Sequence, residues 1–340
     1  MKRFSLSVLL LIAMISCKSA DVNKNHSGDG LVIAFGSCNK QFVENKLWKE
    51  IMKNHPSVWI WGGDNIYSKG EDLNRLKSDY DEQLAQEDYK EIKNRMKILG
   101  TWDDHDYGLN DGGTEFEAKA ASQDLFLDFM GVDDNDIRRD REGVYHSEVI
   151  STEKGSVKVI VLDTRYFRSK LTPSETKGRR YDPNPFGEGT ILGKTQWRWL
   201  KQELNNSEAD FNLIVSSIQV ISSEHGFETW GTMPHQRENL FNMIKNSKAN
   251  NVMILSGDRH ISEFSKVALD GLDYPLIDFT SSGLTHAYSK FSGEQNQHRE
   301  GRVVSEISFG ILKFNFKDKK VTMQMRGEGN ALQQELLQSY

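Results

Sequence analysis

The sequence predicts an α/β fold in which a mixed sheet, or two stacked sheets, is covered by helices. In the first half, short apolar segments alternate with segments whose apolar residues recur at helical spacing. Near the end, segments of alternating polar and apolar residues follow one another closely, which is typical of antiparallel hairpins. The 340 residues are enough for one large α/β domain or two ordinary ones.

The elements follow one another in a regular order. We expect strands over 31–35, 57–61, 96–102, 143–150, 157–163, 211–221, 252–255, 276–280, 310–316 and 321–326. We expect helices over 43–53, 71–94, 115–130 and 194–205, a helix that opens at Pro234, and a short C-terminal helix over 331–338. Residues 165–192, rich in Gly, Pro, Arg and Tyr, are interpreted as a long surface insertion.

The N-terminal segment is expected to be a signal peptide and not part of the fold. Residues 1–16 join a basic start to an apolar run that is too short to span a bilayer. The following residue, Cys17, completes the stretch MISC, which resembles a bacterial lipobox with a lipidated cysteine. We therefore predict an exported, membrane-anchored lipoprotein with a polar tether over 17–30 and a single domain over 31–340. An ordinary signal peptide cleaved near Ala20 is the alternative.

Charge and cysteine content restrict the partners. The formal net charge is −6, and removal of the basic signal peptide makes the chain more acidic, so we expect no specific nucleic-acid binding. The chain has two cysteines, Cys17 and Cys38. If Cys17 carries lipid, Cys38 has no disulfide partner and is either a buried, inert thiol or a metal ligand.

Four apolar strands end in glycine and polar residues. These ends are GSC at 36–38, GGDNIY at 62–67, TWDDHD at 101–106 and SGDRH at 256–260. Ligands of α/β sheets bind outside the carboxyl ends of strands, so we expect one pocket that contains Cys38, Asp64, Tyr67, Asp104, His105, Asp258 and His260. Thiolate, phenolate, imidazole and carboxylate are all metal ligands, and so many acids need cations nearby. Two metals that share one carboxylate would suit the set.

Taken singly, these residues also have structural interpretations. The structural interpretation of Cys38 is a buried thiol, and that of Asp64 is a helix cap or turn residue. The structural interpretation of Tyr67 is core packing, and that of His260 is a hydrogen-bonded core histidine. Asp103 and Asp106 are expected either to be solvated loop acids or to orient the pair between them, and the sequence leaves open whether Asp103 or Asp104 is the ligand. The occurrence of all four ends in one chain favours a shared metal site.

The four motifs, in this order, resemble the PhoD-like alkaline phosphatases, a branch of the calcineurin-like metallophosphatases. The resemblance covers roughly residues 31–290, and GDxIY and WDDH are its more specific parts. It implies a sandwich of two stacked mixed sheets flanked by helices, and a metal-dependent phosphoester hydrolase. It also implies a binuclear or larger centre with iron (Fe3+) and calcium (Ca2+). Thiolate and phenolate ligands suit ferric iron, and the surplus carboxylates suit calcium.

The resemblance gives each residue an expected role. Asp64 would bridge the metals, Asp104 would hold the second metal, and the iron side would be held by Cys38, Tyr67, Asp258 and His260. His105 would protonate the leaving oxygen or stabilise phosphoryl oxygens while a metal-activated water attacks. Arg259 would clamp the phosphate, with a surface or nearby ion pair as its alternative. His225, Arg165 and Trp230 are weaker site candidates.

The expected substrate is a small phosphoester, and the sequence does not decide between monoester and diester. A phospholipid or nucleotide phosphodiesterase is one alternative, and a non-catalytic metal-binding surface lipoprotein is another. The insertion carries six basic residues that would either steer anionic substrates or form a solvated loop. They are Arg165, Arg168, Lys170, Lys177, Arg179 and Arg180.

Overall fold

The computed structural model describes residues 30–68 and 72–340. Cys17, the predicted signal peptide over 1–16 and all but the last residue of the predicted tether lie outside the described residues. Within them, no helix is long and apolar enough to cross a membrane.

The first sheet has the strand order β15-β14-β13-β1-β2-β3. Its strands are β1 (Leu31–Gly36), β2 (Val58–Gly62), β3 (Lys97–Thr101), β13 (Phe309–Asn315), β14 (Lys320–Arg326) and β15 (Leu332–Ser339). β1, β2 and β3 are parallel, whereas β13, β14 and β15 pair antiparallel. The parallel strands are almost wholly buried, which explains their continuous apolar sequences.

The second sheet has the order β12-β10-β11-β9-β8-β5-β4. Its strands are β4 (His146–Ser151), β5 (Ser156–Val161), β8 (Phe211–Val215), β9 (Val252–Ser256), β10 (Ser262–Val267), β11 (Leu276–Ser281) and β12 (Arg299–Val304). β5, β8, β9 and β11 are parallel, and β4, β10 and β12 pair antiparallel at the two sides. β10 and β12 were not expected from the sequence.

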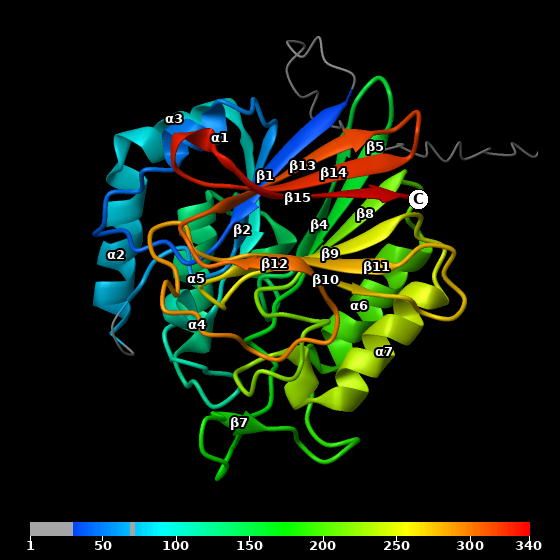
Figure 1. The fold of residues 1–340 in the computed structure, drawn as a ribbon. Helices are drawn as coiled ribbons and strands as arrows, with labels where there is room; N and C mark the ends of the chain where they lie inside the picture. The colour runs from blue at the N-terminus through cyan, green and yellow to red at the C-terminus, as the bar shows by residue number, and fades with distance from the viewer. Residues whose placement is uncertain (1–29, 69–71) are drawn as a thin grey trace, which may run out of the picture.

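Helices cover the outer faces of the two stacked sheets (Figure 1). The first sheet is covered by α1 (Trp48–Met52), α2 (Leu73–Ala85), α3 (Glu87–Arg95) and α5 (Lys119–Met130), and the second by α6 (Gly193–Asn205) and α7 (Pro234–Lys245). An apolar core that includes Phe35, Val159, Leu213 and Phe279 fills the space between the sheets. The prediction of two stacked mixed sheets flanked by helices is confirmed.

The remaining elements are short. A single helical turn, α4 (Asp104–Tyr107), follows β3, and the insertion contains the small hairpin of β6 (Thr172–Pro173) and β7 (Tyr181–Asp182). Three 3-10 helices are η1 (Ile137–Arg139), η2 (Trp230–Thr232) and η3 (Glu328–Asn330).

Several predicted elements differ from the observed ones. The expected helix over 71–94 is two helices, because Gln86 is extended and breaks the chain between α2 and α3. The expected helix over 43–53 is reduced to α1, since the segment before it forms turns in which the side chain of Asn45 accepts from the N–H of Leu47. The expected C-terminal helix over 331–338 is wrong, because this segment is strand β15.

Candidate metal centre

The carboxyl ends of β1, β2 and β3 meet the carboxyl end of β9 from the other sheet. A bridge between Ser37 and Ser282 joins the sheets at this point. Gly257 permits the close approach, because a Cβ there would lie 2.5 Å from Ser37 Oγ and 2.6 Å from the carbonyl oxygen of Gly62. A cavity of about 230 Å³ opens here, and its lining includes Asp64, Asp104, His105, Asp258, Arg259 and His260.

Four of the predicted ligands form a chain of hydrogen bonds. Asp64 Oδ2 accepts from the Cys38 thiol at 3.5 Å and from the Tyr67 hydroxyl at 2.9 Å. The same hydroxyl lies 2.8 Å from His260 Nε2, and Cys38 Sγ lies 3.1 Å from Ser282 Oγ. The structure thus brings thiol, carboxylate, phenol and imidazole together from three strand ends.

The adjacent aspartates Asp103 and Asp104 point to different partners. Asp104 lines the cavity, where its Oδ2 accepts from the N–H of Asp111 at 2.8 Å and its buried Oδ1 has no hydrogen-bond partner. Asp103 Oδ1 accepts from Arg165 Nε and from Ser217 Oγ, each at 2.6 Å, and its Oδ2 is buried without a partner. Asp104 therefore faces the cavity, whereas Asp103 is fixed by its hydrogen bonds with Arg165 and Ser217.

His105 and Asp106 complete the turn after β3. The N–H of His105 donates to Asp64 Oδ1 at 3.2 Å, and its ring packs 4.1 Å from the ring of Tyr67. Asp106 is fully buried and accepts from the N–H groups of Asp103 at 2.6 Å and of Asp64 at 3.2 Å. The interpretation of Asp103 and Asp106 as solvated loop acids is wrong, because both are buried. Their hydrogen bonds instead fit the interpretation that they orient Asp104 and His105, which lie between them.

Left-handed backbone conformations concentrate at the site. Nine non-glycine residues of the described chain have positive φ, and four of them are predicted ligands: Cys38, Asp64, Asp258 and His260. Such conformations cost on the order of 1–3 kcal/mol each, and they cluster at functional sites. Here the left-handed turns direct the side chains of these four residues into one small volume.

The acidic groups of the cluster lie close enough to repel one another. Burial, followed by the neighbouring Asp104, raises the pKa of Asp64 well above its usual range. Burial, followed by the charge of Asp103, also raises the pKa of Asp258 well above its usual range. Burial raises the pKa of the Cys38 thiol to about 11. A bound cation reverses each of these shifts, because it stabilises the deprotonated form of every ligand.

The positions of the ligand atoms fit more than one cation. Among the described residues, three groups have ligand atoms within 4.8 Å of one another: Cys38, Asp64 and His260; Asp64, Asp104 and His105; and Asp103, Asp104 and Asp258. Asp64 belongs to two groups and Asp104 to two, as carboxylates between neighbouring ions would. The free carboxylate oxygens and the mixed thiol, imidazole and carboxylate donors make the residues present a suitable metal centre.

Arg259 lines the cavity but is also paired. Its Nη2 donates to both carboxylate oxygens of Glu294, at 2.9 and 2.8 Å, and its guanidinium lies 4.3 Å from the ring of Phe227. The ion pair given as its alternative is therefore present. It holds the guanidinium in place at the wall of the cavity.

The weaker candidates have mainly structural positions. Trp230 is fully buried, donates to Ser216 Oγ and caps the core against Trp197. His225 is buried with Nε2 unpartnered, and burial lowers its pKa.

The predicted basic patch of the insertion is wrong in part. Arg165 and Arg168 have no exposed surface. Both pair with the buried carboxylate of Glu228. Arg180 does reach the cavity, where it pairs with Asp111 at 2.7 Å and keeps about half of its side chain exposed.

Sequence reasoning missed three residues near the centre. His286 packs 4.4 Å from the His260 ring and 4.9 Å from the Tyr67 ring, with Nε2 unpartnered. It follows the end of β11 in the stretch SSGLTH, a fifth strand end with glycine and polar residues that the same pattern could have identified. Glu228 and Asp111, which also line the cavity, come from loops without such a signal.

The fold and the site together define a class. This is a protein of two stacked mixed sheets whose strand ends hold a cluster of metal-ligating side chains. The chain belongs to the PhoD-like phosphatase family, whose model matches residues 33–331.

A known protein of similar sequence agrees with this membership. The chain is 27% identical over 188 residues to alkaline phosphatase D of Bacillus subtilis (strain 168), a match that covers 50% of this chain and 32% of that protein. The matched part is thus only about a third of the length of that relative.

Three solved structures share the fold over 92% of this chain. A structure of PhoD matches with a TM-score of 0.68 at 20% identity and 69% coverage of that chain. GAP50, the anchor in the inner membrane complex of Plasmodium, matches with 0.58 at 14% identity and 89% coverage. A dimetal phosphatase from Danio rerio matches with 0.53 at 12% identity over 100% of that chain.

Proposed function

We propose that the protein is a metal-dependent phosphoester hydrolase that acts on small phosphoesters. The observation that carries the proposal is the overlap of three metal-ligating groups at one cavity, in a chain of the PhoD-like phosphatase family. When bound, the cations supply positive charge toward phosphoryl oxygens and activate a water for attack on phosphorus. Phosphomonoesters and phosphodiesters both remain within this proposal.

The proposed metal ligands of this chain are Cys38, Asp64, Tyr67, Asp104, Asp258 and His260. Asp64 would serve two neighbouring ions, because it belongs to two of the groups of ligand atoms. One of its oxygens accepts from Cys38 and Tyr67, and the other accepts from the backbone N–H of His105. The sulfur and phenol donors favour ferric iron on the Cys38 side. The carboxylates around Asp104 favour calcium.

Two residues are proposed to act on the substrate. His105 lies at the cavity wall beside Asp64 and Asp104, where its ring can donate a proton to the leaving oxygen. Arg259, fixed by Glu294, presents a permanent positive charge to phosphoryl oxygens. Arg180 adds a second, more exposed guanidinium at the same cavity.

The site favours catalysis over a purely structural metal centre. Holding the fold would need neither His105 nor two arginines at the wall of an open cavity. The shared fold alone does not separate the two functions, because one neighbour is described as an anchor and another as a phosphatase.

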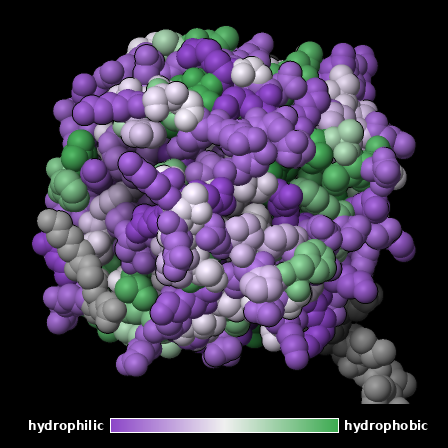
Figure 2. Space-filling model, turned by 60° about the horizontal axis from the view of Figure 1, so that its bottom comes forward, coloured by the Kyte–Doolittle hydropathy of each residue, from purple (hydrophilic) through white to green (hydrophobic). Residues whose placement is uncertain are grey.

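A small, water-soluble substrate is preferred to a phospholipid. The face that carries the loops around β7 is predominantly hydrophilic, and its hydrophobic residues lie in separate groups (Figure 2). We also propose export and anchoring of the protein through a lipidated Cys17, on the strength of the MISC stretch.

The decisive experiment compares metal content and hydrolysis in the same samples. Asp64→Asn introduces a side chain of the same size that tolerates the left-handed backbone at this position, and it removes the shared negative charge. We expect it to lose at least about a hundredfold in the rate on p-nitrophenyl phosphate or bis-p-nitrophenyl phosphate, and to lose bound metal by elemental analysis. The matched control is Asp318→Asn, an exposed turn residue whose loss should change neither. Wild-type rates and metal content in Asp64→Asn would overturn the proposed site.

A further inference from the structure

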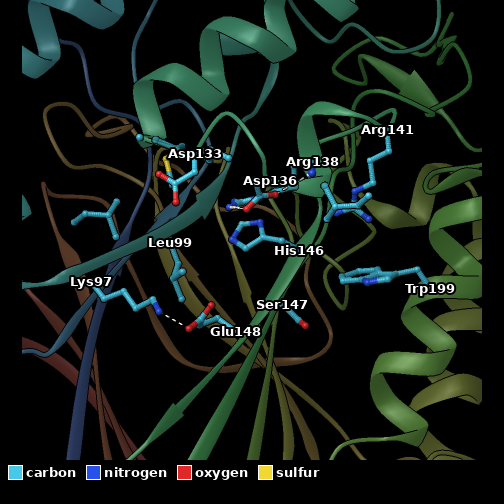
Figure 3. A pocket seen from close by; sticks show the side chains of 15 residues that line it. Lys97, Leu99, Asp133, Asp136, Arg138, Arg141, His146, Ser147, Glu148 and Trp199 are labelled. Atoms are coloured by element: carbon cyan, nitrogen blue, oxygen red, sulfur yellow. Dashed lines mark hydrogen bonds and ion pairs between the residues drawn. The ribbon is translucent and has the colours of Figure 1, made fainter. Parts of the chain in front are cut away.

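A second, larger cavity lies where the edges of the two sheets face each other. It has a volume of about 620 Å³ and is lined by residues of edge strands β3 and β4, of the segment from Met130 to Arg141, and of α6. It shares no lining residue with the cavity at the metal centre. Figure 3 shows His146 in the middle of the side chains that line it. Its size is that of a small-molecule site.

His146 offers an unused hydrogen-bond acceptor in this cavity. Its Nδ1 lies 3.1 Å from the carbonyl oxygen of Val144 and must donate to it, so Nε2 carries the lone pair. Nε2 is buried and has no hydrogen-bond partner. Burial, followed by the nearby Arg138, lowers the pKa of His146 to about 3, so the ring stays neutral and Nε2 remains an acceptor at physiological pH.

Arg141 offers an unused donor in the same cavity. Its Nη2 donates to the carbonyl oxygen of Tyr145, and its guanidinium lies 3.7 Å from the Tyr145 ring centroid. Its Nε is buried without a partner. A buried donor and a buried acceptor need hydrogen-bond partners, and a ligand with polar groups of both kinds would supply them.

The charges around the cavity balance. Arg138 pairs with Asp136 at 2.7 Å, and Lys97 pairs with Glu148. The remaining charged lining residues are Arg141 and Asp133, one of each sign. No excess positive charge is therefore available for a phosphate or another anion, and the cavity suits a neutral ligand.

The α6 side of the cavity is aromatic. Trp199 is partly buried and lines the cavity (Figure 3). Its ring packs 4.8 Å from the ring of Tyr145. The face of an indole is an apolar surface on which the C–H face of a sugar ring can lie. Sugar hydroxyls both donate and accept hydrogen bonds, which matches His146 Nε2 and Arg141 Nε together.

From these observations we propose that the cavity between β3 and β4 binds a neutral, hydroxyl-rich molecule of mono- or disaccharide size. Trp199 provides the stacking surface, His146 accepts from one hydroxyl and Arg141 donates to another. The proposal does not depend on the proposed phosphoester hydrolysis.

The test is calorimetric titration of the chain without the predicted signal peptide over 1–16. The probes are glucose, galactose, maltose and sucrose, with adenosine and inorganic phosphate for comparison, each up to roughly 10 mM, which detects even millimolar affinity. We expect at least one sugar to bind. His146→Phe, which keeps a ring but removes the acceptor, should weaken that binding by about tenfold or more. His146→Gln, which restores an acceptor near the same place, should recover part of it.

Two further variants make the result decisive. Trp199→Leu, at a partly exposed position of α6, should also weaken sugar binding and provides the test if His146→Phe does not fold. Asp64→Asn, in the other cavity, should leave sugar binding unchanged. The proposal is overturned if none of the four sugars binds, if adenosine binds in their place, or if sugar binding survives both His146→Phe and Trp199→Leu.

Discussion

Arg165 is buried between two carboxylates and determines how Asp103 is held. Its Nη1 lies 2.6 Å from Glu228, and its Nε donates to Asp103. Arg168 approaches the other oxygen of Glu228 at 2.8 Å. Burial raises the pKa of Asp103 to about 7 although Arg165 opposes this, so the carboxylate depends on the guanidinium for its charge. The network supports the turn that carries Asp104. Glu228 lines the cavity, whereas Arg165 does not.

We predict that Arg165→Met lowers the free energy of unfolding by about 3–5 kcal/mol, because it leaves buried carboxylates without their partner. The matched control is Arg180→Met. Arg180 also pairs with an aspartate, but its side chain is 52% exposed, and we expect a change below about 1 kcal/mol. Denaturant unfolding of both variants measures the difference. Equal losses would contradict the larger contribution assigned to the buried ion pairs of Arg165.

The sequence predicts the ligands at strand ends better than it predicts the burial of the arginines. Cys38, Asp64 and Asp104 were found because each follows an apolar strand, and strand ends are visible in the sequence. The burial of Arg165 and Arg168 was not predictable from the basic composition of the insertion. Their partner Glu228 is some 60 residues away along the chain, and only the packed fold brings it to them.

Among the elements, the C-terminal segment departs most from the sequence-based prediction. Leu332, Leu336 and Leu337 recur at a spacing that also suits a helix. In the structure this segment pairs antiparallel with β14 along its whole length, with Leu336 opposite Met323. Pairing satisfies backbone groups that the edge of β14 would otherwise expose, and such tertiary pairing outweighs a weak local preference.

The alternation of a strand gives a direct test with neighbouring leucines. Leu336 packs against the core between the sheets, whereas Leu337 is 57% exposed. We predict that Leu336→Ala lowers the free energy of unfolding by about 1–2 kcal/mol, since the side chain is only partly buried. Leu337→Ala should change it by less than about 0.5 kcal/mol. Denaturant unfolding of the two variants decides, and similar losses from both would contradict the strand assignment.

At the scale of the whole molecule, the two sheets contribute different ligands to one centre. Cys38, Asp64 and Asp104 come from the first sheet, and Asp258 and His260 come from the second. The pattern of strand ends predicted that the β9 end would share a pocket with the ends of β1 and β2, but it did not show that β9 belongs to the other sheet. That juxtaposition depends on the packing of the two sheets over their shared core.

Because bound cations would join the two sheets, their removal should lower the stability of the whole fold. At a free metal concentration of about 100 times its Kd, binding stabilises the folded state by about 2.7 kcal/mol. For a chain of this size, that corresponds to a fall in Tm of about 4 °C when a chelator removes the metal. Asp318→Asn should show the same fall as the wild type.

Asp64→Asn should respond differently, and differential scanning calorimetry with and without chelator measures this. We expect its Tm to change by less than about 2 °C on chelation, because the residue shared by two ligand groups is lost. In chelator it should be at least as stable as the wild type, because one carboxylate has been removed from a buried cluster in which the pKa of Asp64 is raised. A wild-type Tm that chelation leaves unchanged would mean that no cation links the sheets. A lower Tm of Asp64→Asn in chelator would instead assign Asp64 a structural role in the metal-free fold.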